Sequence, residues 1–402
     1  MSTNPKAVDA YYVTSQQMMV LPVLVGFYLA FRLCITYLFF QSEPHTGSAI
    51  SVGLNLSVFG IVAFHSLGPA STTLASTLKV RCFRWVMLFL GFSGCSLFWS
   101  ATVSLTVAFA YWCGMAADVF IVVLLLRIGP ADRMSAALIK GYVCGACLIA
   151  LVAWLSPTMQ DLRPGNDDFF SPNAIGFTCA FGVFLAQFLI RRTGQWKIPA
   201  IFLAITLLRS LSKTTLIAFI AGEILLLVRD TTISRRSTIS IVITCAAVIA
   251  SFWKLIEAYY EVYTNAGNQA ETFTGRIGIW AIVLERSLER PWIGHGFHSF
   301  RNVIPPFGTF EAWHAHNELL QQFYAYGIVG VILLIALYSS FYLQVRRLSS
   351  PSDKAFFIGL IFFIIVRGLG DTERFDLSFP LWSIALISLM LAPTESSIEV
   401  PA

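Results

Sequence analysis

Residues 313–343 read WHAHNELLQQFYAYGIVGVILLIALYSSFYL, and this stretch decides the fold class that we expect. Its second half is a largely apolar run, and about 20 apolar residues are enough for a helix to cross a bilayer. Its first half instead gathers two histidines, an asparagine, a glutamate and two glutamines. The pattern predicts a membrane helix whose entrance is lined by polar side chains.

The composition of the whole chain agrees with a lipid environment. Of the 402 residues, 56% are hydrophobic and only 12% are charged, whereas a soluble domain carries about 25% charged residues. Apolar segments that could cross a bilayer occur about twelve times. We therefore expect an all-α integral membrane protein with a single polytopic domain over residues 1–402, with spans near 18–40, 49–66, 85–100, 104–126, 137–155, 173–190, 198–211, 214–228, 237–256, 317–343, 355–368 and 379–392.

The positions of lysine and arginine predict how these spans are oriented. Loops rich in basic residues stay on the cytoplasmic side of the membrane. Alternate loops carry about three basic residues each, at 79–84, 127–140, 191–197, 229–236 and 346–354. Both termini are therefore expected in the cytoplasm. The one large loop, residues 257–316 between the ninth and tenth expected spans, then lies on the outer face.

The large loop contains an amphipathic pattern, TFTGRIGIWAIVLERSLERPWIGHGF at 272–297. Thr274 is placed to cap the start of a helix and Pro291 to end it. An apolar face is expected from Ile277, Trp280, Ala281, Leu284 and Leu288. Such a helix would lie over the spans at the membrane interface. Arg276 near its start and Arg290 after its end would frame whatever lies beneath it.

Two polar features predict a pocket on this face. On a helix, Asn317, Gln321 and Tyr324 would form a polar stripe at the outer end of the span. Arg209 and Lys213, in the turn of LLRSLSKTTL (207–216), stand between two apolar spans. Ionisable residues at membrane depth usually face a cavity or a partner.

Three interpretations of His316 are open from the residues alone. It could be a hydrogen-bonded interfacial histidine beside two tryptophans. It could bind a metal with His298 and His314, although that spacing matches no standard zinc pattern. It could be a general base or an anion contact that faces arginines, which suits transfer chemistry on a phosphate-linked substrate. We favour the third interpretation and expect no metal.

The motif HNELLQQFYAYGIVG (316–330) resembles the signature of the O-antigen ligase and polymerase superfamily, and GRIGIWAIVLERSLERPWIGHGFHSF (275–300) resembles the stretch that precedes it. The resemblance covers residues 200–345 most clearly. It implies a glycosyltransferase of the C-type (GT-C) architecture in the bacterial inner membrane, with its active site facing the periplasm. The implied donor is a glycan on undecaprenyl diphosphate, with no metal, nucleotide sugar or other cofactor and no nucleic-acid partner.

The resemblance also implies roles for particular residues. His316 matches the essential histidine and Arg276 the arginine that opens the outer helix, while Lys213 stands where many relatives have arginine. The implied diphosphate contacts are Arg276, Arg209 and Lys213, with Arg163 or Arg290 assisting and Arg367 as a weaker candidate. Residues expected around the acceptor or behind the base are His314, Asn317, Glu318 and Gln321.

The transferase functions that remain open differ in the acceptor that receives the glycan. A polymerase would extend another lipid-linked repeat, beside a possible chain-length regulator, and a ligase would transfer the glycan to lipid A core. The turn SLSKTT favours the polymerase. A transporter of lipid-linked glycan is the alternative from another class, but the sequence has no evident internal repeat of the kind that transporters show.

Overall fold

The computed structural model describes residues 5–40, 43–67, 74–159, 162–165, 170–234, 236, 239–240, 243, 246–247, 250–265, 273–300, 314–372 and 377–392. Within these ranges the chain is helical and forms no strand, apart from an isolated bridge between Thr158 and Pro164. Each expected span outside 237–256 is a helix, and the segment 237–256 lies only in part within the described residues. The all-α prediction is confirmed.

Seven of the described helices are long and apolar enough to cross a membrane. They run over Met19–Phe39, Thr46–His65, Arg81–Trp99, Leu105–Ile128, Ala131–Leu155, Pro172–Thr193 and Glu318–Arg346. The expected spans at 198–211, 214–228 and 355–368 correspond to the helices α8 (Lys197–Arg209), α9 (Lys213–Arg229) and α14 (Pro351–Gly368), and α15 (Leu381–Met390) is a shorter apolar helix. The chain is therefore a multi-pass membrane protein.

The chain divides into two compact units, and neither is continuous in sequence. The first contains residues 1–72, 123–216 and 245–262, and the second contains residues 73–122, 217–244 and 263–402. Helix α5 (Leu105–Ile128), together with α9 and α11 (Trp253–Asn265), contributes to both.

The first unit is built on the contact of α1 (Pro5–Phe39) with α6 (Ala131–Leu155). Their backbones touch because glycine stands at the crossing, as small residues do where membrane helices pack closely. A Cβ on Gly26 would lie 1.9 Å from the carbonyl oxygen of Leu138, and one on Gly141 would lie 1.9 Å from that of Val23. No larger residue fits at either position.

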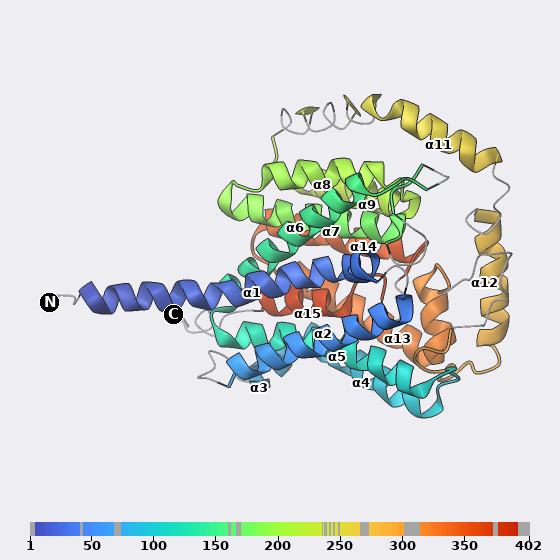
Figure 1. The fold of residues 1–402 in the computed structure, drawn as a ribbon, viewed down its shortest axis with the longest axis horizontal. Coiled ribbons are helices and arrows are strands. Elements are labelled where there is room, and N and C mark those ends of the chain that lie inside the picture. Colours follow the sequence, from blue (N-terminus) through green and yellow to red (C-terminus); the bar gives the residue numbers. More distant parts are fainter. Residues whose placement is uncertain are drawn as a thin grey trace. The chain divides into compact units, whose positions relative to one another are not determined.

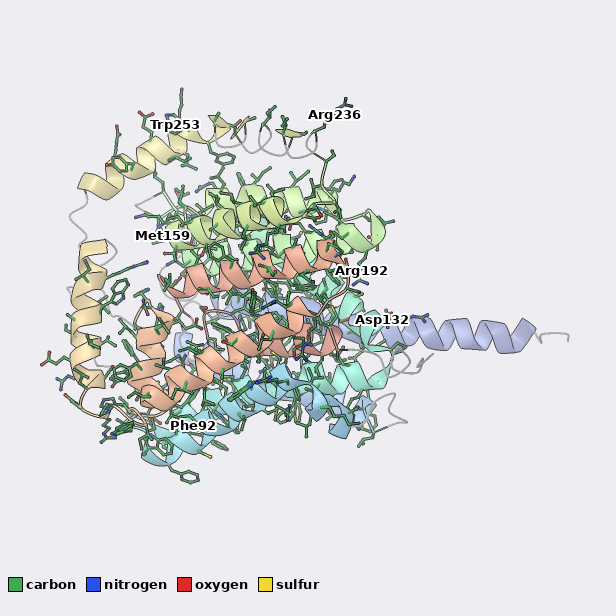
Figure 2. All side chains as sticks on the ribbon, turned by 180° about the vertical axis from the view of Figure 1, so that it is seen from behind. Phe92, Asp132, Met159, Arg192, Arg236 and Trp253 are labelled. Atoms are coloured by element: carbon green, nitrogen blue, oxygen red, sulfur yellow. The ribbon has the colours of Figure 1, made fainter. Side chains whose placement is uncertain are left out.

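The remaining helices of this unit pack around α6. Helix α2 (Pro44–His65) contacts α1, while α7 (Pro172–Thr193) and α8 contact α6 and each other. Arg192, labelled in Figure 2, lies at the end of α7 with its guanidinium carbon 5.0 Å from the centre of the Phe188 ring. A basic side chain suits a helix C-terminus because the helix dipole is negative there.

The second unit contains α3 (Leu74–Lys79), α4 (Arg81–Cys95), the short helix η1 (Ser96–Trp99), α12 (Phe273–Ser287), α13 (Glu318–Arg346), α14 and α15. Helix α13 is the organising element, since it contacts α4, α12, α14 and α15. It is broken at Gly327, whose backbone is not helical (φ 63°, ψ −157°). Figure 1 shows the part before Gly327 running beside α12, across the direction of the part that follows.

The bend is stabilised by the turn after α12. The amide N–H groups of His295 and Gly296 donate to the carbonyls of Tyr324 and Ala325, at 3.0 and 2.7 Å. A Cβ on Gly327 would lie 2.4 Å from the carbonyl carbon of Trp292. Gly327 of α13 and the glycines of the PWIGHGF segment thus let two backbones meet at the bend.

The face of α12 that packs against α13 differs from the one expected. Ile279 and Val283 are buried, in a cluster with Phe300, Ala315 and Tyr324. Ile277, Leu284 and Leu288 instead remain exposed. Trp280, a member of the expected face, does pack against this cluster. The expected face is therefore right at Trp280 and differs at the three exposed residues, because α12 is apolar on two arcs.

Candidate active site

His316 lies in the short segment before α13, held in a fixed position by three hydrogen bonds. The amide of Ala315 donates to Oε1 of Gln321 at 2.9 Å, the indole of Trp280 donates to the carbonyl of Ala315 at 3.0 Å, and the amide of His316 donates to Nδ1 of His314 at 3.3 Å. The backbone of His316 is left-handed, with φ 50°. Residues held in such conformations cluster at functional sites.

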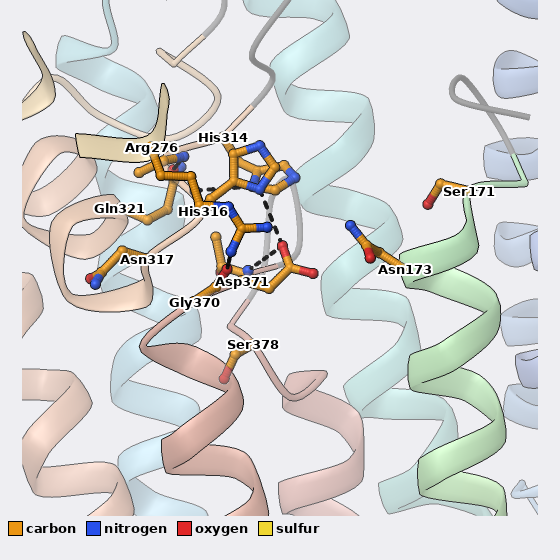
Figure 3. Close-up of polar contacts among 12 residues, drawn as sticks. Ser171, Asn173, Arg276, His314, His316, Asn317, Gln321, Gly370, Asp371 and Ser378 are labelled. Carbon is orange, nitrogen blue, oxygen red and sulfur yellow. Dashed lines mark hydrogen bonds and ion pairs between the residues drawn. The ribbon is translucent and has the colours of Figure 1, made fainter. Parts of the chain in front are cut away.

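Asp371, in the loop after α14, faces the imidazole of His316. Its Oδ1 atom lies 3.4 Å from Nδ1 of the histidine. Figure 3 draws this contact as a dashed line. This separation is long for a hydrogen bond, and the buried Nδ1 makes no hydrogen bond to any described residue. Catalytic contacts are often this loose before substrate binds. The pair therefore has the arrangement of a base and the carboxylate that orients it.

Arg367, near the end of α14, keeps Asp371 ionised. One guanidinium nitrogen lies 3.7 Å from Oδ2 of Asp371, and another donates to the carbonyl of Ser378. Burial by itself raises the pKa of Asp371, but the contact with His316 and the charge of Arg367 outweigh it and hold that pKa well below its usual range. The carboxylate is thus negative at any physiological pH.

Arg276, in the first turns of α12, reaches the same loop. It donates to the carbonyl oxygen of Gly370 at 2.6 Å, beside His316 and Asp371 in Figure 3. The side chain is only half-buried. A positive charge that borders a histidine and an ionised carboxylate can hold an anion next to the base.

Two residues expected to orient His316 are engaged elsewhere. Asn317 caps α13 by accepting from the amide of Leu320 at 3.1 Å, donates to the carbonyl of Leu369 at 3.0 Å and is turned away from His316 in Figure 3. Glu318 is buried and accepts from the amide and hydroxyl of Ser378 at 2.6 and 2.9 Å. Both side chains tie α13 to the loop of Asp371. In the predicted polar stripe, Asn317 caps α13, Gln321 accepts from the amide of Ala315, and the hydroxyl of Tyr324 donates to the carbonyl of Ser299 at 3.4 Å.

Two further predicted residues lie apart from His316 within the same unit. Arg290 is exposed beyond the far end of α12 from Arg276, more than about 15 Å along the helix. His298 contacts Thr102 Oγ1 at 2.9 Å and stacks on Tyr111. The alternative metal site of His298 with His314 and His316 therefore does not form among the described residues. The potential ligand atoms that do come together, within 4.8 Å, belong to His314, His316 and Asp371.

The remaining predicted phosphate contacts belong to the first unit. Arg209 ends α8 and donates to the carbonyl of Leu162 at 2.7 Å, next to the buried Arg163. Lys213 begins α9 and is exposed. Leu162 and Leu211 both have left-handed backbones, with φ 68° and 50°. The two segments that carry these cations are thus shaped by tight local turns.

A hydroxyl cluster supports the turn between α8 and α9. Ser212 donates to Oδ1 of Asn173 at 2.9 Å and lies 3.0 Å from the hydroxyl of Thr215. A Cβ on Gly176 would lie 2.7 Å from the side chain of Ser212, so the turn packs directly on α7. The turn formed by the motif SLSKTT is therefore held by hydrogen bonds and by packing on α7, and Lys213 is exposed on it.

The sequence reasoning missed Asp371, although it had singled out Arg367. A signal was available, because VRGLGD (366–371) ends an apolar segment with a basic and an acidic residue four apart, the spacing of neighbours on a helix. Only the fold shows that the acidic residue meets His316 from a distant part of the sequence.

Comparisons with known proteins identify relatives of this chain. Residues 198–335 match the O-Antigen ligase family. The chain is 25% identical to the exopolysaccharide production protein ExoQ of Rhizobium meliloti over 314 residues, which cover 70% of this chain and 71% of that protein. It is also 27% identical to an O-antigen ligase of Pseudomonas aeruginosa over 160 residues, which cover 39% of this chain and 37% of the relative.

The matched region contains Arg209, Lys213, Arg276 and His316, whereas Asp371 lies beyond it. The resemblance proposed from the sequence motif is thereby confirmed. These matches support a membrane enzyme of glycan processing that is similar to the O-antigen ligase and polymerase superfamily, with an O-Antigen ligase family domain at residues 198–335.

Proposed function

We propose that this enzyme transfers a glycan from undecaprenyl diphosphate to a sugar hydroxyl, on the periplasmic side of the bacterial inner membrane, and thereby polymerises a polysaccharide. The observation that carries the proposal is the contact of His316 with Asp371, 3.4 Å from Nδ1 to Oδ1, beside Arg276. A histidine paired with an ionised carboxylate suits a general base, and a neighbouring arginine suits a phosphate leaving group.

In this mechanism Asp371 determines which nitrogen of His316 acts. Its carboxylate favours the tautomer that carries the proton on Nδ1, which leaves Nε2 as the free acceptor. Nε2 removes the proton of the attacking hydroxyl while that oxygen bonds to the anomeric carbon. The bond from the anomeric carbon to the diphosphate breaks in the same step, and the stereochemistry inverts. Undecaprenyl diphosphate leaves, and Asp371 stabilises the imidazolium that forms.

The leaving diphosphate needs compensating positive charge. Arg276 is a candidate in the same unit as His316, because it donates to the carbonyl of Gly370 next to Asp371. Its guanidinium can donate two parallel hydrogen bonds to phosphate oxygens. Arg209, Lys213 and Arg163, in the first unit, stay predictions as diphosphate ligands on the grounds of the motif. Fixed cations that stabilise developing charge can perform the role often taken by a metal ion, so the proposed transfer requires none.

The choice of polymerase over ligase rests on the relatives. The match that extends over more of both chains is to a protein named for exopolysaccharide production, whereas the match to an O-antigen ligase is shorter. A ligase that transfers the glycan to lipid A core is the second candidate. The basic loops favour cytoplasmic termini, which would expose His316 and Arg276 to the periplasm.

The test is reconstitution of the purified full-length protein in liposomes with one lipid-linked repeat unit. A ladder of longer lipid-linked chains, absent with the His316→Asn variant, would support a polymerase. Glycan that moves only when lipid A core is supplied would identify a ligase and overturn the polymerase. No product under either condition would overturn the transferase and favour transport of the lipid-linked glycan.

A further inference from the structure

The histidine and carboxylate that serve the proposed reaction belong to a larger set of metal-binding side chains. One ligand atom from each of His314, His316 and Asp371 lies within 4.8 Å of the other two. Adjacent ligand atoms around tetrahedral zinc are about 3.4 Å apart, given bonds of about 2.0–2.1 Å. Nδ1 of His316 and Oδ1 of Asp371 already have that separation, 3.4 Å.

The ligand types suit a borderline transition-metal ion rather than magnesium or calcium, and two further properties leave room for an ion. Two imidazoles and one carboxylate are ligands that zinc accepts, with water in the fourth position, whereas magnesium and calcium prefer oxygen ligands. Nδ1 of His316 is buried and makes no hydrogen bond to any described residue. Both histidines are partly exposed, so an ion and its water could enter from outside.

Arg367 does not cover Oδ1, the oxygen of Asp371 that would bind the ion. Arg367 lies against Oδ2, while Oδ1 is directed at His316 and also accepts from the amide of Thr372 at 3.0 Å. The charge of Arg367 and Arg276 disfavours a cation here, and this limits the affinity without blocking the ligand atoms.

We propose that His314, His316 and Asp371 bind a zinc-type divalent ion and that this ion inhibits the enzyme. The ion would occupy Nδ1 of His316 and the Asp371 carboxylate, so the orienting contact between base and carboxylate would be lost. The proposed metal binding does not require that the proposed reaction takes place. The proposed inhibition does, and it therefore rests on the proposed function.

The binding test is a titration of the purified full-length protein, prepared without a histidine tag, with Co²⁺ followed by competition with Zn²⁺. Co²⁺ in a tetrahedral site gives a visible absorption band that needs no enzyme activity. We expect one ion per chain, and His314→Ala and Asp371→Asn should each weaken binding by about tenfold or more. His65→Ala, which removes an exposed histidine of α2, should leave binding unchanged. A wild-type protein without the band, or a band unaffected by His314→Ala, would overturn the site.

The inhibition test adds Zn²⁺ to the transfer assay, then EDTA to reverse its effect. Each variant is compared with its own metal-free rate, and His314→Ala should require about ten times more Zn²⁺ for half-inhibition. If zinc binds but transfer is unaffected or stimulated, the inhibitory role is wrong. If transfer is absent even without metal while the cobalt band is present, the proposed function fails and the metal site stands.

Discussion

The guanidinium of Arg367 and the carboxylate of Asp371 face each other at 3.7 Å from Nη2 to Oδ2, and both side chains are buried. Removing one member of a buried ion pair leaves the other charge uncompensated. Arg367 also donates to the carbonyl of Ser378, whose amide and hydroxyl donate to Glu318. The position of Asp371 opposite His316 therefore depends on charges that belong to α13 and α14.

Asp371→Asn should destabilise the protein by about 3–5 kcal/mol, the usual effect of breaking a buried ion pair. The folded-state pKa of Asp371 is depressed, so its ionised form contributes stability above the unfolded value of about 3.9. That contribution is lost only as the pH falls through the lower folded value. Thermal unfolding in detergent should thus give the same difference from wild type at every pH from about 5 to 8. A difference that already shrinks between pH 8 and 6 would contradict the assignment.

His316→Asn should lower the turnover number by about 100-fold or more, since a general base contributes about 10²–10⁴. Asparagine suits the left-handed backbone at this position, φ 50°, because it tolerates that region better than most residues. The variant therefore separates chemistry from folding. Turnover of the lipid-linked repeat is the readout, with the unfolding temperature as the control for structure. Retained turnover in a stable variant would remove His316 from the role of base.

Lys213→Arg should keep or raise the transfer rate, and Lys213→Met should lower it. A hydrogen bond to a charged group contributes about 1.5–3 kcal/mol, so the loss should be about tenfold to a hundredfold. Arginine offers phosphate two parallel hydrogen bonds, whereas lysine acts as a point charge. Arg286→Met is the matched control, because Arg286 is an exposed cation that pairs with Glu289 at 2.8 Å. Equal rates for wild type and Lys213→Met would exclude Lys213 from diphosphate binding.

The helices and the histidine could be predicted from the sequence because their signals are local. A long apolar run predicts a helix without reference to other segments, and the motif around His316 is contiguous. Asp371 could not be found in this way, because its role depends on how α14 returns to the start of α13. Asn317 and Glu318 were expected beside the base because they are adjacent in sequence. A helix start points consecutive side chains in different directions, and Glu318 reaches Ser378 instead.

The face of α12 that packs against the protein could not be predicted from the sequence either. Its apolar residues occupy two arcs, Ile277 with Leu284 and Leu288, and Ile279 with Val283. Periodicity identifies an apolar arc but not the partner that covers it. The partner is the first part of α13, and the bend at Gly327 places it there.

Gly327→Ala should destabilise the second unit, since this bend decides where His316 lies. The backbone φ of 63° is strained for alanine, and the new Cβ would lie 2.4 Å from the carbonyl carbon of Trp292. Together these should reduce the free energy of unfolding by about 1–3 kcal/mol. Gly278→Ala is the matched control within α12, because nothing lies within 4 Å of its Cβ position. It should instead stabilise the helix by about 0.5–1 kcal/mol. Unfolding in detergent checks both, and a Gly327→Ala protein as stable as wild type would show that the bend does not need glycine.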